Sequence, residues 1–403
     1  MREKFISEPS RKIPVTGEYD VAVCGGGVAG IAAALSAARG GAKTLLIEKQ
    51  FALGGLATLG LVTIYLPLCD GNGRQVSFGL AEELMLLSIE KGREPGHYSP
   101  AWFENGSEED KKKERYQVCF NAQMFALLAE QKLLSEGVEI LYGTSVCATA
   151  VEEKKVTALI LENKSGRTAV SVKSVVDCTG DADIFALSGA RTATFGQGNI
   201  LASWYYSITN GKYALHPVGF CDVPDKEKTE KNKVELLSDR RFTGLCGKEL
   251  SEMTEMSHKS LLSHFLRDGE LSEEHMLTTM ATVPQIRMTR RPVGVYTLDD
   301  ADDHKYFADS VGMISDWRKA GPIFEVPFRC LYGDDLQNVI AAGRCISNTD
   351  AMWDIARVIP CCAVTGQAAG AAAALSDDFS TLSRSIEKLQ KKLSDAGVRL
   401  PIA

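Results

Sequence analysis

The stretch from Tyr19 to Glu48 constrains the fold of this chain more than any other part of it. Its first residues, Val21 to Cys24, form an apolar run with no helical period, which is typical of a buried parallel strand. Gly25, Gly27 and Gly30 follow with the spacing G-x-G-x-x-G. In this pattern the first glycine permits a tight turn, the second lets the backbone approach a pyrophosphate, and the third lets a helix pack against the strand.

The rest of the stretch completes a strand–helix–strand unit. Alanine-rich sequence after Gly30 predicts a helix that lies close to the sheet, and Gly40 and Gly41 end it. The N-terminus of such a helix offers N–H groups and a partial positive charge to phosphate. Thr44 to Ile47 is the second strand, and Glu48 follows it 18 residues after Gly30, where an acceptor for a ribose hydroxyl is expected. The unit predicts a dinucleotide site; the alternative is an α/β turn without a ligand.

Three further motifs resemble those of flavoproteins. Lys49 and the Gly-Gly turn in Leu53 to Thr58 follow the second strand, Val175 to Asp183 contains a Thr-Gly-Asp strand end, and Asn338 to Arg344 is similar to a last strand. The chain thus resembles the FAD-dependent oxidoreductase family of the glutathione-reductase-like, two-dinucleotide-binding-domain flavoprotein superfamily, and is most similar to its bacterial members. The resemblance covers most of the chain and weakens at about 95–118 and 205–280.

The resemblance implies an α/β fold. We expect a Rossmann-like FAD-binding domain, with a central parallel sheet and a β-meander, and an inserted mixed α+β substrate domain. It also implies noncovalently bound FAD. The residues expected at this cofactor are Gly25, Gly27, Val28, Ala29, Gly30, Glu48, Lys49, Gly54, Gly55, Leu56, Ala57, Val146, Cys178, Thr179, Gly180, Asp183, Gly343, Arg344, Ile359, Pro360 and Cys361.

The FAD-binding domain is expected to be discontinuous in sequence. We assign residues 18–65, 120–190 and 329–376 to it, because the motifs lie near the start, middle and end of the chain. Residues 66–119 are expected to form a helical and loop insertion, 191–328 the substrate domain, and 377–403 a C-terminal helix. The charged run at 108–115 is interpreted as a solvated loop or helix start, with a mobile lid as the alternative.

Composition excludes some classes of function. The chain has 403 residues and a net charge of −7, which argues against a general nucleic-acid binder. No apolar run is long enough to span a membrane, and the first twenty residues lack the apolar core of a secretion signal. Eleven scattered cysteines without a C-x-x-C or zinc spacing suit a reducing cytoplasm and no metal. A small-molecule substrate is expected; the electron acceptor and oligomeric state stay open.

The helix expected from Pro360 to Leu375 carries the predicted chemistry. Proline is favoured in the first turn of a helix, and in the family this helix directs its N-terminus at the flavin N1–C2=O edge. Arg357 lies three residues earlier, and we leave two roles open for it: a structural pair with Asp354 or a grip on the substrate or reduced flavin. Cys361 and its neighbour Cys362 are interpreted as small buried thiols rather than a redox pair.

A second candidate site is the arginine-rich segment Gln285 to Gly294. In an extended strand Arg287 and Arg291 would share one face, which suits a bidentate grip on an anion. The alternative is an interdomain strand held by salt bridges. No histidine belongs to a recognisable Ser/His/Asp arrangement, and His216 and His304 are only weak candidates for a general base.

These observations predict an FAD-dependent oxidoreductase. We expect it to transfer a hydride between a small polar substrate, with a carboxylate as one option, and flavin N5, with Arg357, Arg291 and Arg287 as candidate catalytic residues. Two alternatives stay open: an FAD-containing lyase or biosynthetic enzyme without net redox turnover, and a flavin-binding subunit that needs a partner.

Overall fold

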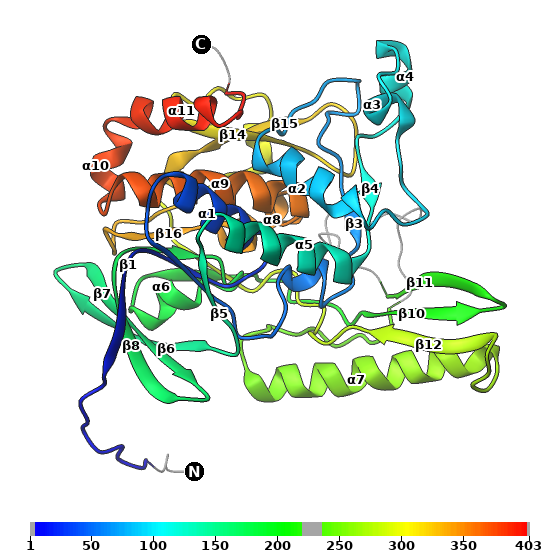
Figure 1. Cartoon of the computed structure of the whole chain (residues 1–403), viewed down its shortest axis with the longest axis horizontal. Helices are drawn as coiled ribbons and strands as arrows, with labels where there is room; N and C mark the ends of the chain where they lie inside the picture. The colour runs from blue at the N-terminus through cyan, green and yellow to red at the C-terminus, as the bar shows by residue number, and fades with distance from the viewer. Residues whose placement is uncertain (1–4, 220–235, 401–403) are drawn as a thin grey trace.

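The computed structural model describes residues 5–219 and 236–400. Helices α1, α9, α2 and α5 lie over a large sheet on one side of the molecule, and a smaller sheet lies on the other side (Figure 1). The fold is therefore of the mixed α/β class, as the sequence predicts.

The large sheet has seven strands, and five of them are parallel. They are β1 (Val15–Cys24), β2 (Thr44–Ile47), β5 (Glu139–Leu141), β8 (Gly166–Asp177) and β16 (Val339–Ala341). Strand β1 lies between β2 and β8, β5 extends the sheet beyond β2, and β16 pairs with β8. The last four residues of β1 are buried on both faces, which explains why the sequence reads as an unbroken apolar run.

A β-meander completes this sheet. Strands β6 (Ser145–Glu152), β7 (Lys155–Asn163) and β8 pair antiparallel in chain order. Strands β7 and β8 form one hairpin, and β6 pairs with the other side of β7. The expected combination of a parallel sheet with a meander is thus confirmed.

Two helices made of small residues cover the parallel strands. Helix α1 (Val28–Arg39) packs against α9 (Ile359–Leu375), the predicted closing helix. Cβ atoms added at Gly366 and Gly370 would collide with the carbonyl oxygens of Ala29 and Ala33. Glycine at these positions therefore lets the two helices approach closely, and it fixes the N-terminal ends of both helices beside the same edge of the sheet.

The insertion between the first two pieces of the sheet combines short helices and strands with loops. It contains β3 (Ile64–Tyr65), α2 (Leu80–Glu90), α3 (Pro100–Phe103), α4 (Glu108–Lys113) and β4 (Val118–Cys119). None of the six residues of α4 is buried, so the charged run forms a short solvated helix. Helix α5 (Ala122–Ser135) follows the insertion.

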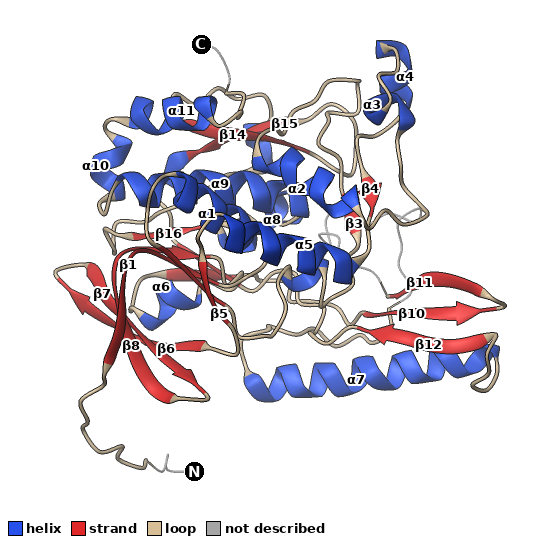
Figure 2. Ribbon diagram, viewed as in Figure 1, coloured by secondary structure: helices blue, strands red, loops and turns tan. Residues whose placement is uncertain are grey.

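The smaller sheet consists of β10 (Ser203–Thr209), β11 (Lys212–Val218) and β12 (His275–Met280), with β10 in the middle. Helix α7 (Gly247–Phe265) runs along one face of it (Figure 2). Tyr205 packs against Leu261 and Phe265 of this helix, whereas Trp204 and Tyr206 face the opposite side. One face of β10 therefore packs on helix α7, and the other face is turned toward the large sheet.

The predicted strand Arg287 to Gly294 is largely wrong. Only β13 (Arg290–Pro292) is a strand, and it pairs with β9 (Thr192–Thr194). Residues 285–289 are irregular, because the side chain of Asn199 rather than a neighbouring strand holds their backbone: its Oδ1 accepts from the N–H groups of Arg287 and Met288 at 2.8 and 2.9 Å.

The remaining elements connect these sheets. A second strand pair is β14 (Ser310–Ser315) with β15 (Ile323–Pro327), and short helices form α6 (Asp183–Leu187) and α8 (Asp350–Ala356).

The single C-terminal helix predicted for Asp377 to Ala396 is broken into two. They are α10 (Phe379–Ser383) and α11 (Ile386–Asp395). The break lets Phe379 and Leu382 bury against one part of the core while the apolar side of α11 packs on α9 and β14. The apolar spacing of the sequence was correct, and only the bend was missed.

Within the residues that the structure describes, no single helix is long and apolar enough to cross a membrane. Helices α8 and α9 satisfy length and composition only as a pair bent by 91°, and both are buried in the core.

Candidate active site

One cavity of about 690 Å³ collects most of the predicted site residues. It lies where β1, β2 and β8 end, and it extends past the first turns of α1 and α9 to the smaller sheet. Crevices at the carboxyl ends of parallel strands are the usual ligand sites of open α/β sheets. The location makes this cavity the candidate binding site.

The three glycines of the first turn have different roles. Gly25 has a φ of +102°, and a Cβ there would contact the carbonyl group of Cys178. A Cβ at Gly30 would collide with the carbonyl oxygen of Gly25, so this glycine serves helix packing and does not line the cavity. A Cβ at Gly27 would meet nothing within 4 Å, and Gly27 lines the cavity. The open space beside Gly27 is where a pyrophosphate would approach the backbone at the start of α1.

Glu48 closes the turn from the side of β2. Its Oε2 accepts from the N–H of Gly26 at 2.6 Å and its Oε1 from the N–H of Gln50 at 2.7 Å. The side chain lines the cavity and is only 7% exposed. Since a carboxylate has about four acceptor positions, these two bonds leave capacity for a ribose hydroxyl.

The Gly-Gly turn lies directly against the first glycine turn. Gly54 has a φ of +100°, and its N–H donates to the carbonyl of Gly26 at 2.8 Å. The hydroxyl of Thr58 donates to the carbonyl of Leu53 at 2.5 Å, which fixes the loop. Gly54, Gly55 and Ala57 all line the cavity, so two glycine turns distant in sequence form one continuous wall.

The Thr-Gly-Asp segment at the end of β8 is organised by Asp177. This fully buried carboxylate accepts from the N–H and hydroxyl of Thr179 and from the N–H groups of Ile184 and Phe185. Burial raises its pKa to about 6, although these hydrogen bonds act in the opposite direction. Asp177 thereby ties the end of β8 to the start of α6 and presents Gly180 to the cavity.

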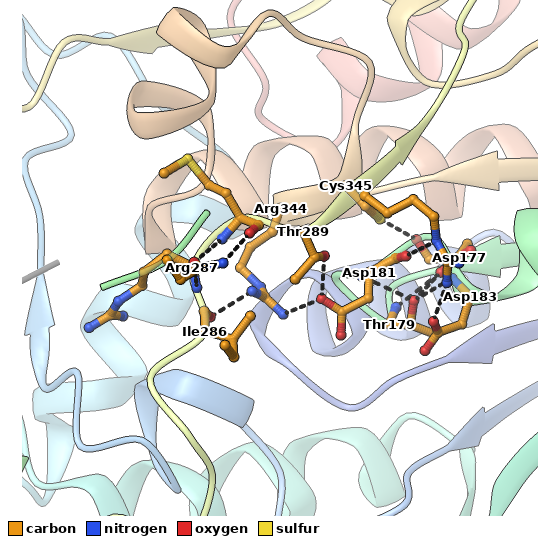
Figure 3. A network of polar contacts seen from close by, with 12 residues as sticks. Asp177, Thr179, Asp181, Asp183, Ile286, Arg287, Thr289, Arg344 and Cys345 are labelled. Carbon is orange, nitrogen blue, oxygen red and sulfur yellow. Dashed lines mark hydrogen bonds and ion pairs between the residues drawn. The ribbon is translucent and has the colours of Figure 1, made fainter. Parts of the chain in front are cut away.

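Arg344 joins the large sheet to the segment that returns from the smaller one (Figure 3). Its Nη1 donates to the carbonyl of Ile286 at 2.7 Å, and its Nη2 lies 3.3 Å from Oδ1 of Asp181. The hydroxyl of Thr289 donates to the same Asp181 oxygen at 2.7 Å. Arg344, Asp181 and Ile286 all line the cavity, so this network holds its two sides together.

The start of α9 forms another part of the wall. Val358 is the residue before the helix, Pro360 lies in its first turn, and Val358, Ile359 and Cys362 line the cavity. Burial raises the pKa of the Cys361 thiol well above its usual range and that of Cys362 to about 12. Both thiols donate to backbone carbonyls. They behave as small buried residues, since a reactive cysteine needs a lowered pKa.

The three candidate arginines lie in different surroundings. Arg357 lines the cavity and also donates to Oδ1 of Asp354, so both roles left open by the sequence are compatible with its position. Arg287 is 4% exposed and lines the cavity as well. Arg291 does not line it; its Nη1 donates to the hydroxyl of Ser347 at 3.2 Å, and burial lowers its pKa. The structure therefore brings Arg287 and Arg357 to one cavity but not Arg291.

Arg357 belongs to a row of alternating charges. Arg318 donates to both carboxylate oxygens of Asp316, and its Nη1 lies 3.5 Å from Oδ2 of Asp354, which in turn pairs with Arg357. Both aspartates are 1% exposed. Two buried acids thus neutralise two arginines, which orients the guanidinium of Arg357 at the cavity.

Most of the residues expected at the cofactor line the cavity. They are Gly25, Gly27, Val28, Ala29, Glu48, Lys49, Gly54, Gly55, Leu56, Ala57, Val146, Cys178, Thr179, Gly180, Asp183, Arg344 and Ile359. The expected residues that are not part of the lining are Gly30, Gly343, Pro360 and Cys361. Like Gly30, Gly343 has a packing role, because its added Cβ would lie 2.7 Å from the Cβ of Ala29.

Sequence reasoning missed the wall contributed by the smaller sheet and nearby loops. These apolar lining residues are called the apolar wall below; they are Leu59, Val62, Ile64, Leu66, Trp204, Leu215, Pro217, Leu250, Val283, Pro284, Ile286 and Trp317. Alternating apolar residues in 204–217 carried some signal, but the chain separation between these segments hid their common location. The two weakly proposed histidines are elsewhere: His216 stacks on Tyr205 with ring centroids 4.7 Å apart, and His304 lies beside Asp303.

The chain matches a known protein family over nearly its whole length. The profile of a family described as FAD dependent oxidoreductase matches residues 20–201 and 204–393. A thioredoxin reductase of Ureaplasma parvum is 34% identical over 71 residues, which are 18% of this chain and 23% of that protein. The chain therefore spans less than a quarter of that relative.

Two solved structures can be aligned with this chain over most of its length. The p-nitrophenol 4-monooxygenase of Pseudomonas putida DLL-E4 shares 13% identity at a TM-score of 0.47, with 94% of this chain and 83% of that one covered. A geranylgeranyl bacteriochlorophyll reductase-like protein of Thermoplasma acidophilum shares 14% identity at a TM-score of 0.43, with 94% and 82% covered.

Proposed function

Because the chain belongs to the FAD-dependent oxidoreductase family and is an enzyme with FAD as its cofactor, we propose that it oxidises or reduces a small organic molecule by hydride exchange with noncovalently bound FAD. The observation that carries this proposal is the single cavity. It runs from the two glycine turns to Arg287 and Trp204, so it has room for a cofactor at one end and a substrate at the other.

The residues present fit FAD on grounds of their own geometry. The space beside Gly27 and the free N–H groups at the start of α1 suit a pyrophosphate, and Glu48 suits the adenosine ribose. Val146 and Ser145, at the start of the meander, line the adenine end in this proposal. Bound FAD supplies the two-electron chemistry, and the protein supplies orientation and electrostatics.

The start of α9 is assigned to the reactive end of the cofactor. The N–H groups of the first turn and the helix dipole favour negative charge there. The guanidinium of Arg357, oriented by Asp354, places N–H groups at the same end of the cavity. Together these groups stabilise an electron-rich ring or the anionic group of a substrate.

Anaerobic titration of the purified protein with a metabolite panel tests the proposal. A true substrate should bleach the flavin absorbance near 450 nm, and acid denaturation should release FAD for mass analysis. Protein that releases NAD instead, or retains flavin after denaturation, would contradict it. Turnover with no bleaching would favour a lyase or biosynthetic role, and bleaching only after adding a second protein would favour a partner-dependent subunit.

We also propose a cytoplasmic location, supported by the cysteines. Ten described cysteines are free, and Cys24, Cys178 and Cys345 are buried with raised pKa values. Thiols used as core residues suit a reducing compartment. Fractionation of the cells that produce the protein would test this.

A further inference from the structure

The cavity changes its chemistry from one end to the other. Around the glycine turns it is lined by backbone and by the charged residues Glu48, Lys49, Asp181 and Asp183. Beyond them lies the apolar wall defined above. Arg287 lies beside Trp204 of this wall, and two further arginines that line the cavity, Arg344 and Arg357, contact Ile286 and Asp354.

The position of Trp204 on this wall is fixed by three contacts. Its indole N–H donates to the carbonyl of Gly219 at 2.9 Å, so the polar edge of the ring is satisfied. The guanidinium of Arg287 lies over its ring, 5.4 Å from the centroid. On the same face of the sheet, Pro217 is the partner of Trp204 across the strands β10 and β11. A broad apolar surface and one cation are therefore held side by side.

The backbone that carries Arg287 is rigid although it is not regular secondary structure. Asn199, 1% exposed, accepts from the N–H groups of Arg287 and Met288 and donates to the carbonyls of Met288 and Phe242. Next along the chain, Ile286 is tied to Arg344. A site whose supporting hydrogen bonds are formed before binding loses little entropy when the ligand arrives.

We infer that the substrate is a carboxylic acid with an apolar, ring-sized body, its carboxylate at Arg287 and its body against Trp204 and the apolar wall. The inference rests on the proposed function and names the substrate class for that site. The N–H groups of a guanidinium lie in its own plane, so the position of Arg287 over the Trp204 ring is compatible with a bidentate grip on a carboxylate. We assign the substrate an apolar body because a small polar substrate would leave the apolar wall without a partner.

Isothermal titration calorimetry on the FAD-loaded protein tests the inference without needing turnover. The probes are acetate, butyrate, hexanoate, phenylacetate and phenylacetamide. Affinity should rise about fourfold for each buried methylene along the aliphatic series, phenylacetate should bind far more tightly than acetate, and phenylacetamide should bind at least about tenfold more weakly than phenylacetate. Equal affinity for acetate and phenylacetate, or for the acid and its amide, would overturn the inference, as would no binding of any acid.

Matched variants assign the two parts of the ligand to their residues. Arg287→Gln should remove the preference for acid over amide, and Trp204→Leu should weaken phenylacetate while leaving acetate unchanged. Arg191→Gln and Tyr213→Leu change an exposed arginine and an exposed tyrosine outside the lining, and they should bind phenylacetate like wild type. Unchanged preference in Arg287→Gln would overturn the inference.

Failure of the proposed function has a separate signature. The FAD content and the bleaching of the flavin by dithionite are measured on the same samples. Protein that carries FAD and bleaches, yet binds no acid, overturns only the inference. Protein that neither carries nor takes up FAD overturns both.

Discussion

At the scale of single residues, the glycines of one motif have unrelated structural roles. Gly30 and Gly27 differ in what a methyl group would meet: a carbonyl oxygen in the first case and open space in the second. The backbone of Gly27 has a φ of −66°, which any residue can adopt. Glycine is therefore needed for packing at position 30 and for ligand space at position 27.

Gly27→Ala and Gly30→Ala should therefore fail in different ways. Gly27→Ala should keep the melting temperature of the apoprotein within about 2 °C of wild type, while its Kd for FAD rises at least about tenfold because the methyl group occupies the pyrophosphate space. Gly30→Ala should lower the stability of the apoprotein by about 1–3 kcal/mol through overpacking. Thermal melts without FAD and fluorescence titration with FAD measure the two effects. Similar melts for both variants would contradict the division of roles.

Glu48 has a double role, and its removal should show both. Glu48→Ala should weaken FAD binding about ten- to a hundredfold, since losing a charged acceptor costs about 1.5–3 kcal/mol. It should also lower the stability of the apoprotein, because the N–H groups of Gly26 and Gln50 lose their acceptor. Titration of FAD into the apoprotein checks the first part, and wild-type affinity would refute the assignment to the ribose.

Where a motif is local, most of the residues that it predicts for the cofactor line the cavity. Gly25, Gly27 and Glu48 lie within one strand–helix–strand unit, and each was placed by its spacing alone. Trp204 was seen only as an aromatic in a region of changed composition. Its position beside Arg287 depends on Asn199 and on pairing of β10 with β11, which no local pattern encodes.

At the scale of elements, what can be predicted depends on whether an element serves one packing surface or two. The last four residues of strand β1 and most of helix α1 are buried, and their apolar and alanine-rich sequences show it. The C-terminal helix has to follow two surfaces, so it bends between α10 and α11 although its apolar period continues. The segment 285–289 was predicted as a strand and is not one, because a side chain supplies the hydrogen bonds that a partner strand would give.

The junction between β8 and α6 should make stability depend on pH. Asp177 is fully buried and its pKa is raised from 3.8 to about 6, mainly by burial. The folded state thus holds this proton more tightly than the unfolded chain. The stabilisation is complete below about pH 4 and is lost as pH rises to about 6, a change of about 3 kcal/mol.

Comparing wild type with Asp177→Asn isolates this contribution from those of other carboxylates. The difference in unfolding free energy between the two proteins, from urea titrations at pH 4, 5, 6 and 7, should change steeply up to about pH 6 and then level off. A difference that is constant across this range would show that Asp177 titrates in the folded protein as it does in the unfolded chain.

At the scale of the whole molecule, the cavity depends on chain segments that are far apart in sequence. Its walls come from the first strand–helix–strand unit, the end of β8, the smaller sheet and the start of α9. Arg344 links two of these parts, since it contacts both Asp181 and Ile286 (Figure 3). Binding of FAD at the cofactor end should therefore stabilise the backbone at the substrate end through this side chain.

Hydrogen exchange of the backbone measures that coupling. Adding FAD to the wild-type apoprotein should slow exchange at residues 25–30 and also at residues 284–289, since a ligand stabilises every part that must be ordered to bind it. In Arg344→Met the protection at 25–30 should persist, because the glycine turns and Glu48 are intact, whereas the protection at 284–289 should largely disappear.

Arg191→Met is the matched control, because Arg191 pairs with Asp335 on the exposed surface and does not line the cavity. It should keep both protected regions. If 284–289 stays protected in Arg344→Met, the coupling passes through the ligand itself or through the packing of Ile286. If FAD protects only 25–30 in wild type, the two ends of the cavity bind independently, and the rigidity of the Arg287 segment comes from Asn199 alone.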